Sequence, residues 1–306
     1  MPAPQLESID ASTRYCAVYG HPVRHSASPA MQNAALKALG LRWRYLAFDV
    51  EPASLKEAIR GAQAMGFIGL NLTVPHKILA AEMVDLVDPG ARRWGAVNTI
   101  RYEGRAADGS WKPLAHFSDS PPSETRSVGF NTDAAAIVRS IREDLDLSLT
   151  GKRVVLLGAG GAGRAAALRL AEERPAALTL INRTRVKAEL LAAEIAALLP
   201  GINLGSSLPS SSVDLLLNTT SLGLNPDDEL PVAEEWLRAH PPNCVYDMIY
   251  RPAETLLLKT ARALGSRTAN GLGMLLHQGA DALELWSGRN APRDVMRRAL
   301  ENAIYG

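Results

Sequence analysis

Cysteine, net charge and long apolar runs are all scarce in this chain of 306 residues. The two cysteines, Cys16 and Cys244, lie far apart and outside any CxxC pattern, which argues against a disulfide framework and favours a reducing cytoplasm. A formal net charge of only +1 argues against recruitment of nucleic acid or of an anionic membrane by a global field. We find no uninterrupted run of about 18 apolar residues and no signal-peptide pattern at the N-terminus. We therefore expect a cytoplasmic protein without nucleic-acid or membrane partners.

The histidines are equally uninformative for metal binding. All six are scattered, with no HExxH motif and no Cys/His pairing of the zinc type, so we predict no metal site. The composition, 47% apolar and 21% charged, is that of an ordinary globular protein with a sizeable core. Its length favours two domains.

The hydrophobic pattern predicts strands that alternate with helices. In the first half, the predicted strands are residues 14–20, 43–50, 68–74 and 96–103, and the predicted helices are residues 29–39, 55–65, 80–88 and 135–145. Further strands, at residues 153–157, 177–184, 213–220 and 243–250, alternate with helices before two C-terminal helices at 273–288 and 292–303. This alternation is typical of βαβ units and a mostly parallel sheet, which is an α/β class. We read residues 1–12 as a loose tail and residues 104–127 as a long, flexible surface loop.

The stretch GLNLTVPHK, residues 69–77, places polar side chains at a predicted strand end. Alternation predicts that Leu70, Leu72 and Val74 share a buried face, with Asn71 and Thr73 on the other face. A proline at position 75 removes a backbone donor and should end the strand. An amide, a hydroxyl and the Lys77 ammonium would then lie at one strand terminus.

A glycine-rich turn follows the strand at 153–157. Gly158, Gly160 and Gly163 have the GxGxxG spacing, directly after an apolar strand and before an Ala-rich helix. In such a turn the first glycine allows the tight bend, the second lets the backbone approach a pyrophosphate, and the third allows close packing of helix on strand. We predict a dinucleotide site.

The end of the next strand indicates which dinucleotide it is. NAD sites usually carry an acidic residue there, whereas this chain has Asn182, followed by the cations Arg183, Arg185 and Lys187. Cations are unfavourable near a helix N-terminus, so a merely solvated face explains them poorly. Because a guanidinium can hold a 2′-phosphate by two charge-assisted bonds, we predict NADP rather than NAD.

The remaining polar residues outside the glycine-rich half collect after predicted strands. They are Ser26, Ser28, Asn71, Thr73, Lys77, Asn98, Thr99, Asn131, Thr132 and Asp133. Each has a plain structural explanation, for example Ser28 as the N-cap of a helix with proline at its first position. Ligands of parallel α/β sheets bind outside the carboxyl ends of the strands. Hydroxyls and amides with one cation and one anion suit a ligand rich in hydroxyl groups.

Taken together, these segments resemble the shikimate dehydrogenase family. The resemblance rests on YGHPVRHSASPAMQNAAL, GLNLTVPHK, GAVNT, GFNTD, GAGGAGRAA, NRT, NTTSLGL and GMLLHQGADALELW, in the family's order along nearly the whole chain. It implies an α/β, two-domain fold: an N-terminal substrate domain with a mostly parallel sheet, plus an NADP-binding Rossmann domain. The substrate-binding catalytic domain would be residues 1–134 and 272–306, and the NADP-binding domain residues 135–271. The implied reaction is the reversible reduction of 3-dehydroshikimate to shikimate by NADPH.

The resemblance also implies roles for individual residues. Lys77 and Asp133 would be catalytic. Ser26 and Ser28 would bind the substrate carboxylate with Tyr250 close to them, Asn71, Thr73, Asn98 and Asp133 would bind ring hydroxyls, and Gln278 would reach the substrate from the C-terminal helices. The implied cofactor contacts are Gly158, Ala159, Gly160, Gly161, Ala162, Gly163, Asn182, Arg183, Thr184, Lys187, Thr219, Ser221 and Gly271.

Three alternatives remain open at this point. A quinate or aminoshikimate dehydrogenase would share the fold, although Ser28 and the Asn182-Arg183-Thr184 sequence argue against a quinate enzyme. A non-catalytic NADP-binding sensor is disfavoured because Lys77 and Asp133 are present. The HSAS and NTD segments count against a methylenetetrahydrofolate dehydrogenase. A monomer and a homodimer are equally compatible with the sequence.

Overall fold

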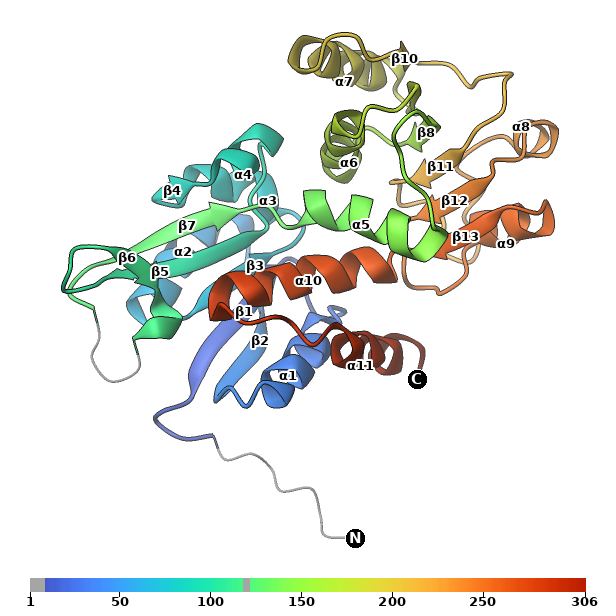
Figure 1. The fold of residues 1–306 in the computed structure, drawn as a ribbon. Helices are drawn as coiled ribbons and strands as arrows, with labels where there is room; N and C mark the ends of the chain where they lie inside the picture. The colour runs from blue at the N-terminus through green and yellow to red at the C-terminus, as the bar shows by residue number, and fades with distance from the viewer. Residues whose placement is uncertain (1–8, 118–121) are drawn as a thin grey trace, which may run out of the picture. The chain divides into compact units, whose positions relative to one another are not determined.

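The computed structural model describes residues 9–117 and 122–306, which divide into two compact units (Figure 1). The first unit runs to Thr132 and adds Gly279–Ile304 and Gly306, and the second comprises Asp133–Gln278 and Tyr305. Most of the predicted loose tail therefore lies outside the described residues. Its described end forms a turn in which the Asp10 carboxylate accepts hydrogen bonds from the backbone N–H and hydroxyl of Ser12.

The first unit is built on a seven-stranded sheet with the order β2-β1-β3-β5-β7-β4, in which β6 pairs with β5. Its strands are β1 (Arg14–Gly20), β2 (Trp43–Asp49), β3 (Gly69–Leu72), β4 (Leu86–Val87), β5 (Thr99–Arg105), β6 (Trp111–Pro113) and β7 (Thr125–Phe130). β1 is parallel to β2 and β3, and β4 is parallel to β7, whereas β5 is antiparallel to β3, β6 and β7.

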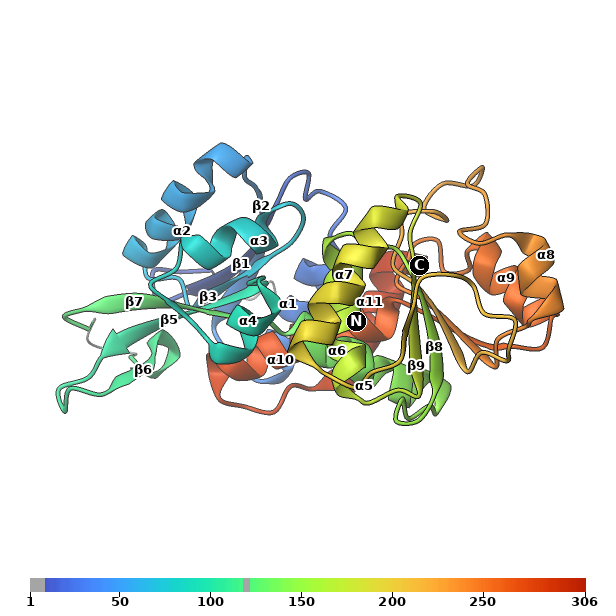
Figure 2. The same cartoon turned by 90° about the horizontal axis from the view of Figure 1, so that it is seen from above.

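Helices cover both faces of this sheet (Figures 1 and 2), with α2 on one face and α10 on the other. The helices are α1 (Ser28–Ala38), α2 (Leu55–Ala64), α3 (His76–Leu79), α4 (Pro89–Trp94), α10 (Leu272–Ser287) and α11 (Arg293–Tyr305), with short 3-10 turns at Pro52–Ser54, Ala80–Glu82 and Leu114–His116. The fully buried indole of Trp286 donates a hydrogen bond of 2.9 Å to the Ile100 carbonyl. A Cβ on Gly69 would lie 2.1 Å from that indole nitrogen, so this position of β3 must be glycine.

The strand that contains GLNL is shorter and more deeply buried than predicted. β3 ends at Leu72, three residues before the proline, and all four of its residues are buried. Val74, predicted to share the buried face, is 69% exposed. The prediction of one buried face was wrong because helices cover both sides of the sheet, so alternation carries no burial signal in a central strand.

The predicted helix at 80–88 was also wrong beyond its first turn. Ala80–Glu82 is a 3-10 turn, and Leu86–Val87 forms β4, which pairs with β7. The reason is a reciprocal clamp: the Ser127 N–H and hydroxyl donate to the Asp85 carboxylate at 2.7 and 2.8 Å, and the Asp85 N–H donates back to the Ser127 hydroxyl at 2.9 Å. These contacts span 42 residues, so no local pattern could reveal them.

The predicted loop at 104–127 contains ordered strands. β5 extends to Arg105, β6 pairs with it, and β7 begins at Thr125, so the prediction of one long loop was wrong for the described part of this segment. The buried carboxylate of Glu103 pairs with Arg101 and Arg126, and the Arg126 guanidinium lies 4.2 Å from the centre of the Trp111 ring. Cross-strand polar and cation–π contacts hold strands whose sequence lacks an apolar period. Residues 118–121 lie outside the described residues.

The second unit contains a six-stranded sheet with the order β10-β9-β8-β11-β12-β13, in which every pairing is parallel. Its strands are β8 (Arg153–Leu157), β9 (Ala177–Ile181), β10 (Leu204–Gly205), β11 (Leu215–Asn218), β12 (Cys244–Asp247) and β13 (Arg267–Asn270). Its helices are α5 (Asp133–Leu145), α6 (Gly161–Glu172), α7 (Arg185–Leu198), α8 (Glu234–Ala239) and α9 (Leu256–Ala263).

Numbered along the chain, the strands of this second sheet follow the order 3-2-1-4-5-6 of a doubly wound dinucleotide-binding fold. The order reverses between β8 and β11, and ligands of such sheets bind at this reversal. Val155, Leu157, Leu216, Val245 and Leu257 belong to the apolar core around the sheet. The predicted α/β class with mostly parallel sheets is confirmed, with antiparallel pairs restricted to the neighbours of β5.

Residues 9–117 and 122–306 contain neither a candidate membrane span nor a candidate metal cluster. None of the helices there is long and apolar enough to cross a membrane. No group of three or more His, Cys, Asp or Glu residues in those ranges could hold a metal ion.

Candidate active site

The glycine-rich turn joins β8 to α6 at the reversal of strand order. Gly158 has a φ of +105°, which side chains rarely adopt, and a Cβ on Gly163 would lie 2.1 Å from the Gly158 carbonyl oxygen. A Cβ on Gly160 would meet nothing within 4 Å. Gly158 and Gly163 are therefore required by the turn itself. Gly160 faces open space, as a position approached by a ligand would.

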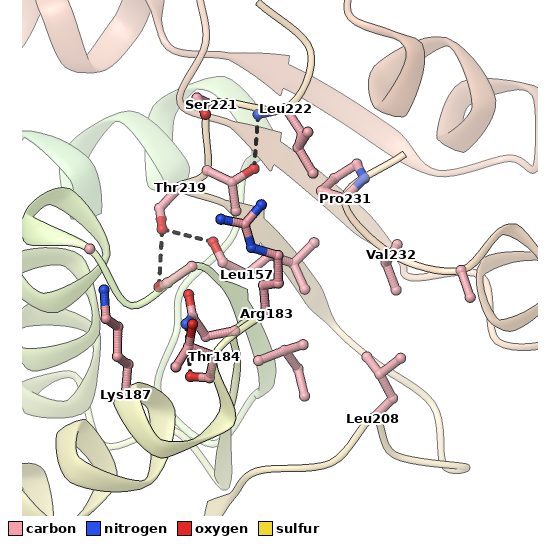
Figure 3. Close-up of a pocket in the computed structure, with 16 residues that line it drawn as sticks. Leu157, Arg183, Thr184, Lys187, Leu208, Thr219, Ser221, Leu222, Pro231 and Val232 are labelled. Atoms are coloured by element: carbon pink, nitrogen blue, oxygen red, sulfur yellow. Dashed lines mark hydrogen bonds between the residues drawn. The ribbon is translucent and has the colours of Figure 1, made fainter. Parts of the chain in front are cut away.

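A cavity of about 680 Å³ opens beside this turn (Figure 3). It is lined by Leu157, Gly158, Gly160, Ile181, Asn182, Arg183, Thr184, Lys187, Leu208, Thr219, Thr220, Ser221, Leu222, Pro231, Val232 and Ala233. Eight of the residues predicted to bind a cofactor are among them, and they come from three separate chain segments. The sheet order brings these segments together, because β8, β9 and β11 are neighbours that all end at this edge.

Asn182 fastens the end of β9 to the glycine-rich turn. Its side-chain oxygen accepts a hydrogen bond of 3.0 Å from the Ala159 N–H, and its side-chain nitrogen donates one of 2.9 Å to the Thr184 carbonyl. Asn182 thus holds two segments of the cavity lining, the glycine-rich turn and residues 182–184, in place. A carboxylate could not donate the second of these bonds, so an acidic residue at position 182 could not make both contacts.

Two of the three predicted cations line the cavity. Figure 3 shows Arg183 in the middle of the lining residues and Lys187 extending from α7. Arg185 does not line the cavity, since its guanidinium pairs with the Glu189 carboxylate at 2.7 Å, one helical turn further along α7. The cavity lining therefore includes two cations and lies beside the N-terminus of α6, an arrangement suited to a ligand with several phosphates.

Five predicted cofactor residues are not among the lining residues. They are Ala159, Gly161, Ala162, Gly163 and Gly271. The Ala159 N–H donates to Asn182, whereas Gly161, Ala162 and Gly163 form the first turn of α6, where backbone N–H groups can face an anion. A Cβ on Gly271 would lie 2.1 Å from the Met248 carbonyl oxygen, so this glycine allows the chain to pass close to the end of β12.

In the first unit, buried polar side chains form a hydrogen-bonded row across neighbouring strands. The Tyr45 hydroxyl donates to the Asn71 side-chain oxygen at 2.7 Å, and the Asn71 amide donates to the Thr99 hydroxyl at 3.0 Å. The Asn98 amide donates to the Thr132 hydroxyl at 3.0 Å, and its oxygen accepts from the Thr132 N–H at 2.7 Å. These contacts hold two of the predicted substrate residues, Asn71 on β3 and Asn98 directly before β5, in defined orientations.

Electrostatically, this row is neutral. Burial raises the pKa of Tyr45 well above its ordinary value, and a hydrogen bond from Ser28 only partly offsets this effect. The phenol therefore keeps its proton and acts as a donor to Asn71. A donor fixed on the amide oxygen sets which end of Asn71 faces Thr99.

Ser26, Ser28, Thr73 and Lys77 also belong to the first unit. Ser28 is the first residue of α1 rather than its N-cap, which is Ala27, and its N–H donates to the Ser26 hydroxyl at 3.3 Å. The prediction of Ser28 as a cap was wrong by one residue. Lys77 is the second residue of α3 and is partly exposed, and its carbonyl accepts from the Val97 N–H at 2.8 Å.

Three of the residues predicted to be catalytic or to bind the substrate belong to the second unit. Asp133 is the first residue of α5. Gln278 lies on α10 and donates to the Leu275 carbonyl of its own helix at 2.8 Å. Burial raises the pKa of Tyr250, whose carbonyl accepts a hydrogen bond from the Tyr305 hydroxyl at 3.1 Å.

Several contributors were missed among the predicted site residues. Tyr45 lies in an ordinary apolar strand, and only its contact with Asn71 reveals it. Thr99 and Thr132 were visible as polar residues near strand ends and belong to the same row. In the cavity, Thr220, Leu208, Leu222 and the segment 231–233 were missed, because no motif marks an apolar wall.

Comparison with family models gives three matches along the chain. The model described as the shikimate dehydrogenase substrate binding domain matches residues 18–100. The model described as shikimate / quinate 5-dehydrogenase matches residues 139–210, and the model described as the shikimate 5′-dehydrogenase C-terminal domain matches residues 271–301. The three matches follow one another and together span parts of both compact units.

Relatives match over almost the full length. The NADP(+) shikimate dehydrogenase of Moorella thermoacetica is 45% identical over 304 residues, which cover 97% of this chain and 95% of the relative. A crystal structure of a shikimate dehydrogenase in complex with NADP+ has a TM-score of 0.84 at 38% identity and covers 99% of both chains. The Thermus thermophilus shikimate 5-dehydrogenase, solved with NADP(H) and shikimate, has a TM-score of 0.77 at 35% identity, with 95% of this chain and 99% of that chain covered.

Proposed function

The chain belongs to the shikimate dehydrogenase family, and on that basis we propose that it catalyses the reversible, NADPH-dependent reduction of 3-dehydroshikimate to shikimate. It is an NADP-dependent oxidoreductase of the shikimate pathway, which supplies aromatic amino-acid biosynthesis. The single observation that carries the cofactor assignment is one cavity that contains the glycine-rich turn together with Arg183 and Lys187.

The residues of this cavity fit a dinucleotide that carries an extra phosphate. The turn leaves room at Gly160 while Gly158 and Gly163 are sterically required, so the backbone N–H groups at the start of α6 can approach the pyrophosphate. Arg183 and Lys187 would hold the 2′-phosphate, with Thr184 beside them. Thr219 and Ser221 would line the path towards the nicotinamide, and the predicted residues Ala159, Gly161, Ala162, Asn182 and Gly271 would support this binding from the surrounding backbone.

We assign the two functions to two parts of the chain. Residues 1–134 and 272–306 form the substrate-binding catalytic domain, and residues 135–271 form the NADP-binding domain. The division into compact units after Thr132 and Gln278 supports the first boundary to within two residues and places the second one seven residues later. The match of residues 18–100 to a substrate-binding model supports the role of the first part.

The buried polar row prepares the substrate residues for hydroxyl recognition. Asn98 uses one amide N–H on Thr132, which leaves the second for a ring hydroxyl, and Asn71 keeps an acceptor site on the oxygen that Tyr45 contacts. Thr73 and Asp133 complete this set, and Gln278 would add a contact from α10. Ser26 and Ser28 at the start of α1 would bind the carboxylate, with Tyr250 close to it.

Lys77 would handle the proton of the reaction. NADPH supplies the hydride when it is bound. Negative charge then develops on the carbonyl oxygen, and the Lys77 ammonium stabilises that charge and donates its proton to the oxygen. In the oxidation direction, a neutral Lys77 would accept the proton of the hydroxyl, with Asp133 as the second catalytic residue.

The test is oxidation of shikimate and of quinate, each with NADP and with NAD, followed by the absorbance of the reduced cofactor. We expect fast turnover only with shikimate and NADP. A preference for quinate or aminoshikimate, or for NAD, would assign the chain to a sister activity on the same fold. No turnover with any pair, combined with tight NADP binding, would support the non-catalytic sensor.

We also propose a cytoplasmic location, supported by two buried cysteines that form no disulfide.

A further inference from the structure

A buried carboxylate lies beside the cofactor cavity without lining it. Asp247, the last residue of β12, is 0% exposed, and burial raises its pKa. Its oxygens accept three hydrogen bonds: 3.0 Å from the Asn218 amide, 3.1 Å from the Ile249 N–H and 2.7 Å from the Thr255 hydroxyl. All three donors are neutral groups. A carboxylate is costly to bury, and its presence calls for a role.

Asn218 connects this carboxylate to the wall of the cavity. It is the last residue of β11, in register with Asp247 on one side and with Leu157 on the other. Its side-chain oxygen accepts from the Thr220 N–H at 3.0 Å and from the Thr220 hydroxyl at 2.8 Å, and its nitrogen also donates to the Leu222 carbonyl at 3.2 Å. Since Asp247 accepts from that nitrogen, it determines which end of the amide faces Thr220.

Residues 219–222, which form the wall of the cavity next to Asn218, are hydrogen-bonded to the end of β8 and to the glycine-rich turn. The Thr219 hydroxyl donates to the Leu157 carbonyl at 2.7 Å and to the Gly158 carbonyl at 3.2 Å, as the dashed lines in Figure 3 show. A Cβ on Gly158 or on Gly163 would lie 2.7 Å from this hydroxyl oxygen. A shift of residues 219–222 would therefore move the turn that cradles the pyrophosphate.

We propose that Asp247 is a positioning residue for the cofactor, which acts through Asn218 on the 219–222 wall of the cavity. The proposal rests on the proposed function, because it takes the occupant of the cavity to be NADP(H). Asp247 itself is not among the residues that line the cavity. Its second branch, through Thr255, leads to the N-cap of α9, where the Thr255 hydroxyl accepts from the Leu258 N–H. Because Asp247 bonds separately to Asn218 and to Thr255, variants can distinguish an effect on cofactor binding from an effect on stability.

The experiment measures NADPH binding to the full chain by fluorescence titration, together with KM for NADP and for shikimate. Asp247→Ala removes the partner of the Asn218 amide, and we expect the Kd for NADPH and the KM for NADP to rise about 10-fold or more. We expect KM for shikimate to stay within about 2-fold. Thr255→Val is the matched control: it breaks the other branch of the same carboxylate while keeping the side-chain shape. It should lower the unfolding temperature and leave the Kd for NADPH unchanged.

Each outcome decides the proposal. An unchanged Kd in Asp247→Ala would overturn it, and so would an equal rise in Thr255→Val, since the carboxylate would then act through general stability. Should Asp247→Ala fail to fold, Asp247→Leu takes its place, because an apolar side chain of similar shape fills the same space and removes the oxygen that accepts from the Asn218 amide. A Kd raised about 3-fold would then support the proposal, and an unchanged Kd would overturn it. Failure of the wild-type chain to bind NADPH at all would instead reject the proposed function and this proposal together.

Discussion

The hydroxyl of Tyr45 on β2 donates a hydrogen bond of 2.7 Å to the side-chain oxygen of Asn71 on β3, and both side chains are buried. The strands they occupy lie on opposite sides of β1. Tyr45, which belongs to no recognisable motif, therefore orients Asn71, which belongs to the stretch GLNLTVPHK. If Asn71 binds a ring hydroxyl as proposed, this relationship joins the packing of the first sheet to substrate recognition.

Removal of the Tyr45 hydroxyl should weaken substrate binding selectively. Tyr45→Phe leaves the buried oxygen of Asn71 without its donor, which costs about 1–3 kcal/mol and frees the amide to rotate. We expect KM for shikimate to rise several-fold while KM for NADP is unchanged. Steady-state kinetics with each substrate varied in turn, and urea unfolding for stability, measure both effects.

Tyr102→Phe is the matched control for that variant. Its hydroxyl is also buried and donates at 2.7 Å, but to the Ile59 carbonyl on α2, outside the polar row. It should lower the free energy of unfolding by a similar amount with no change in KM for shikimate. If the two variants altered KM equally, the orienting role of Tyr45 would be refuted.

The elements that could be predicted from the sequence are those whose signal is local. Residues 14–20 form a strand with the predicted limits, and the glycine-rich turn lies between a strand and a helix as expected. Such elements are defined by runs of apolar residues and by glycines that no other residue can replace. Arg183 and Lys187 could be predicted as a pair because they flank the start of one helix.

The parts that could not be predicted depend on contacts between distant residues. β4 exists because Asp85 and Ser127 clamp it to β7, and the hairpin around β6 is held by polar contacts of Glu103 and Arg126. The same holds at the site: Asn218 and Asp247 become partners only when β11 and β12 pair in register. No periodicity encodes these pairs, so only the folded chain reveals them.

Neutralisation of Lys77 should reduce the chemical step far more than binding. Lys77→Met keeps a chain of similar length and removes the proton donor, so we expect kcat to fall about 10²- to 10⁴-fold, with KM for shikimate changed only modestly. Lys112→Met is the control, since the Lys112 ammonium pairs with Asp108 at 3.4 Å on the surface and should not affect turnover. A kcat close to that of the wild type would exclude Lys77 as the proton donor.

Loss of the Arg183 guanidinium should alter the choice of cofactor. Arg183→Ala removes charge-assisted hydrogen bonds to a 2′-phosphate, and we expect kcat/KM with NADP to fall about 10- to 100-fold while that with NAD changes little. Arg185→Ala provides the comparison, because Arg185 pairs with Glu189 and does not line the cavity. Equal losses with NADP and NAD in Arg183→Ala would show that this residue does not distinguish the two cofactors.

The pH dependence of stability should report the buried carboxylate of Asp247. Burial raises its pKa above the ordinary value of 3.8, while hydrogen bonds from Thr255, Ile249 and Asn218 oppose that rise. The folded chain therefore binds this proton more readily than the unfolded chain does. Because of this, folding loses stability as pH rises from the unfolded pKa through the folded one.

Asp247→Asn removes this titration and makes the effect measurable. We expect the free energy of unfolding of the wild type, minus that of Asp247→Asn, to decrease as pH rises from about 4 to about 7. Urea unfolding of both proteins across that range measures the difference, and groups shared by the two proteins cancel. A difference that stays constant or increases with pH would mean that the Asp247 carboxylate is no harder to ionise in the folded chain than in the unfolded one.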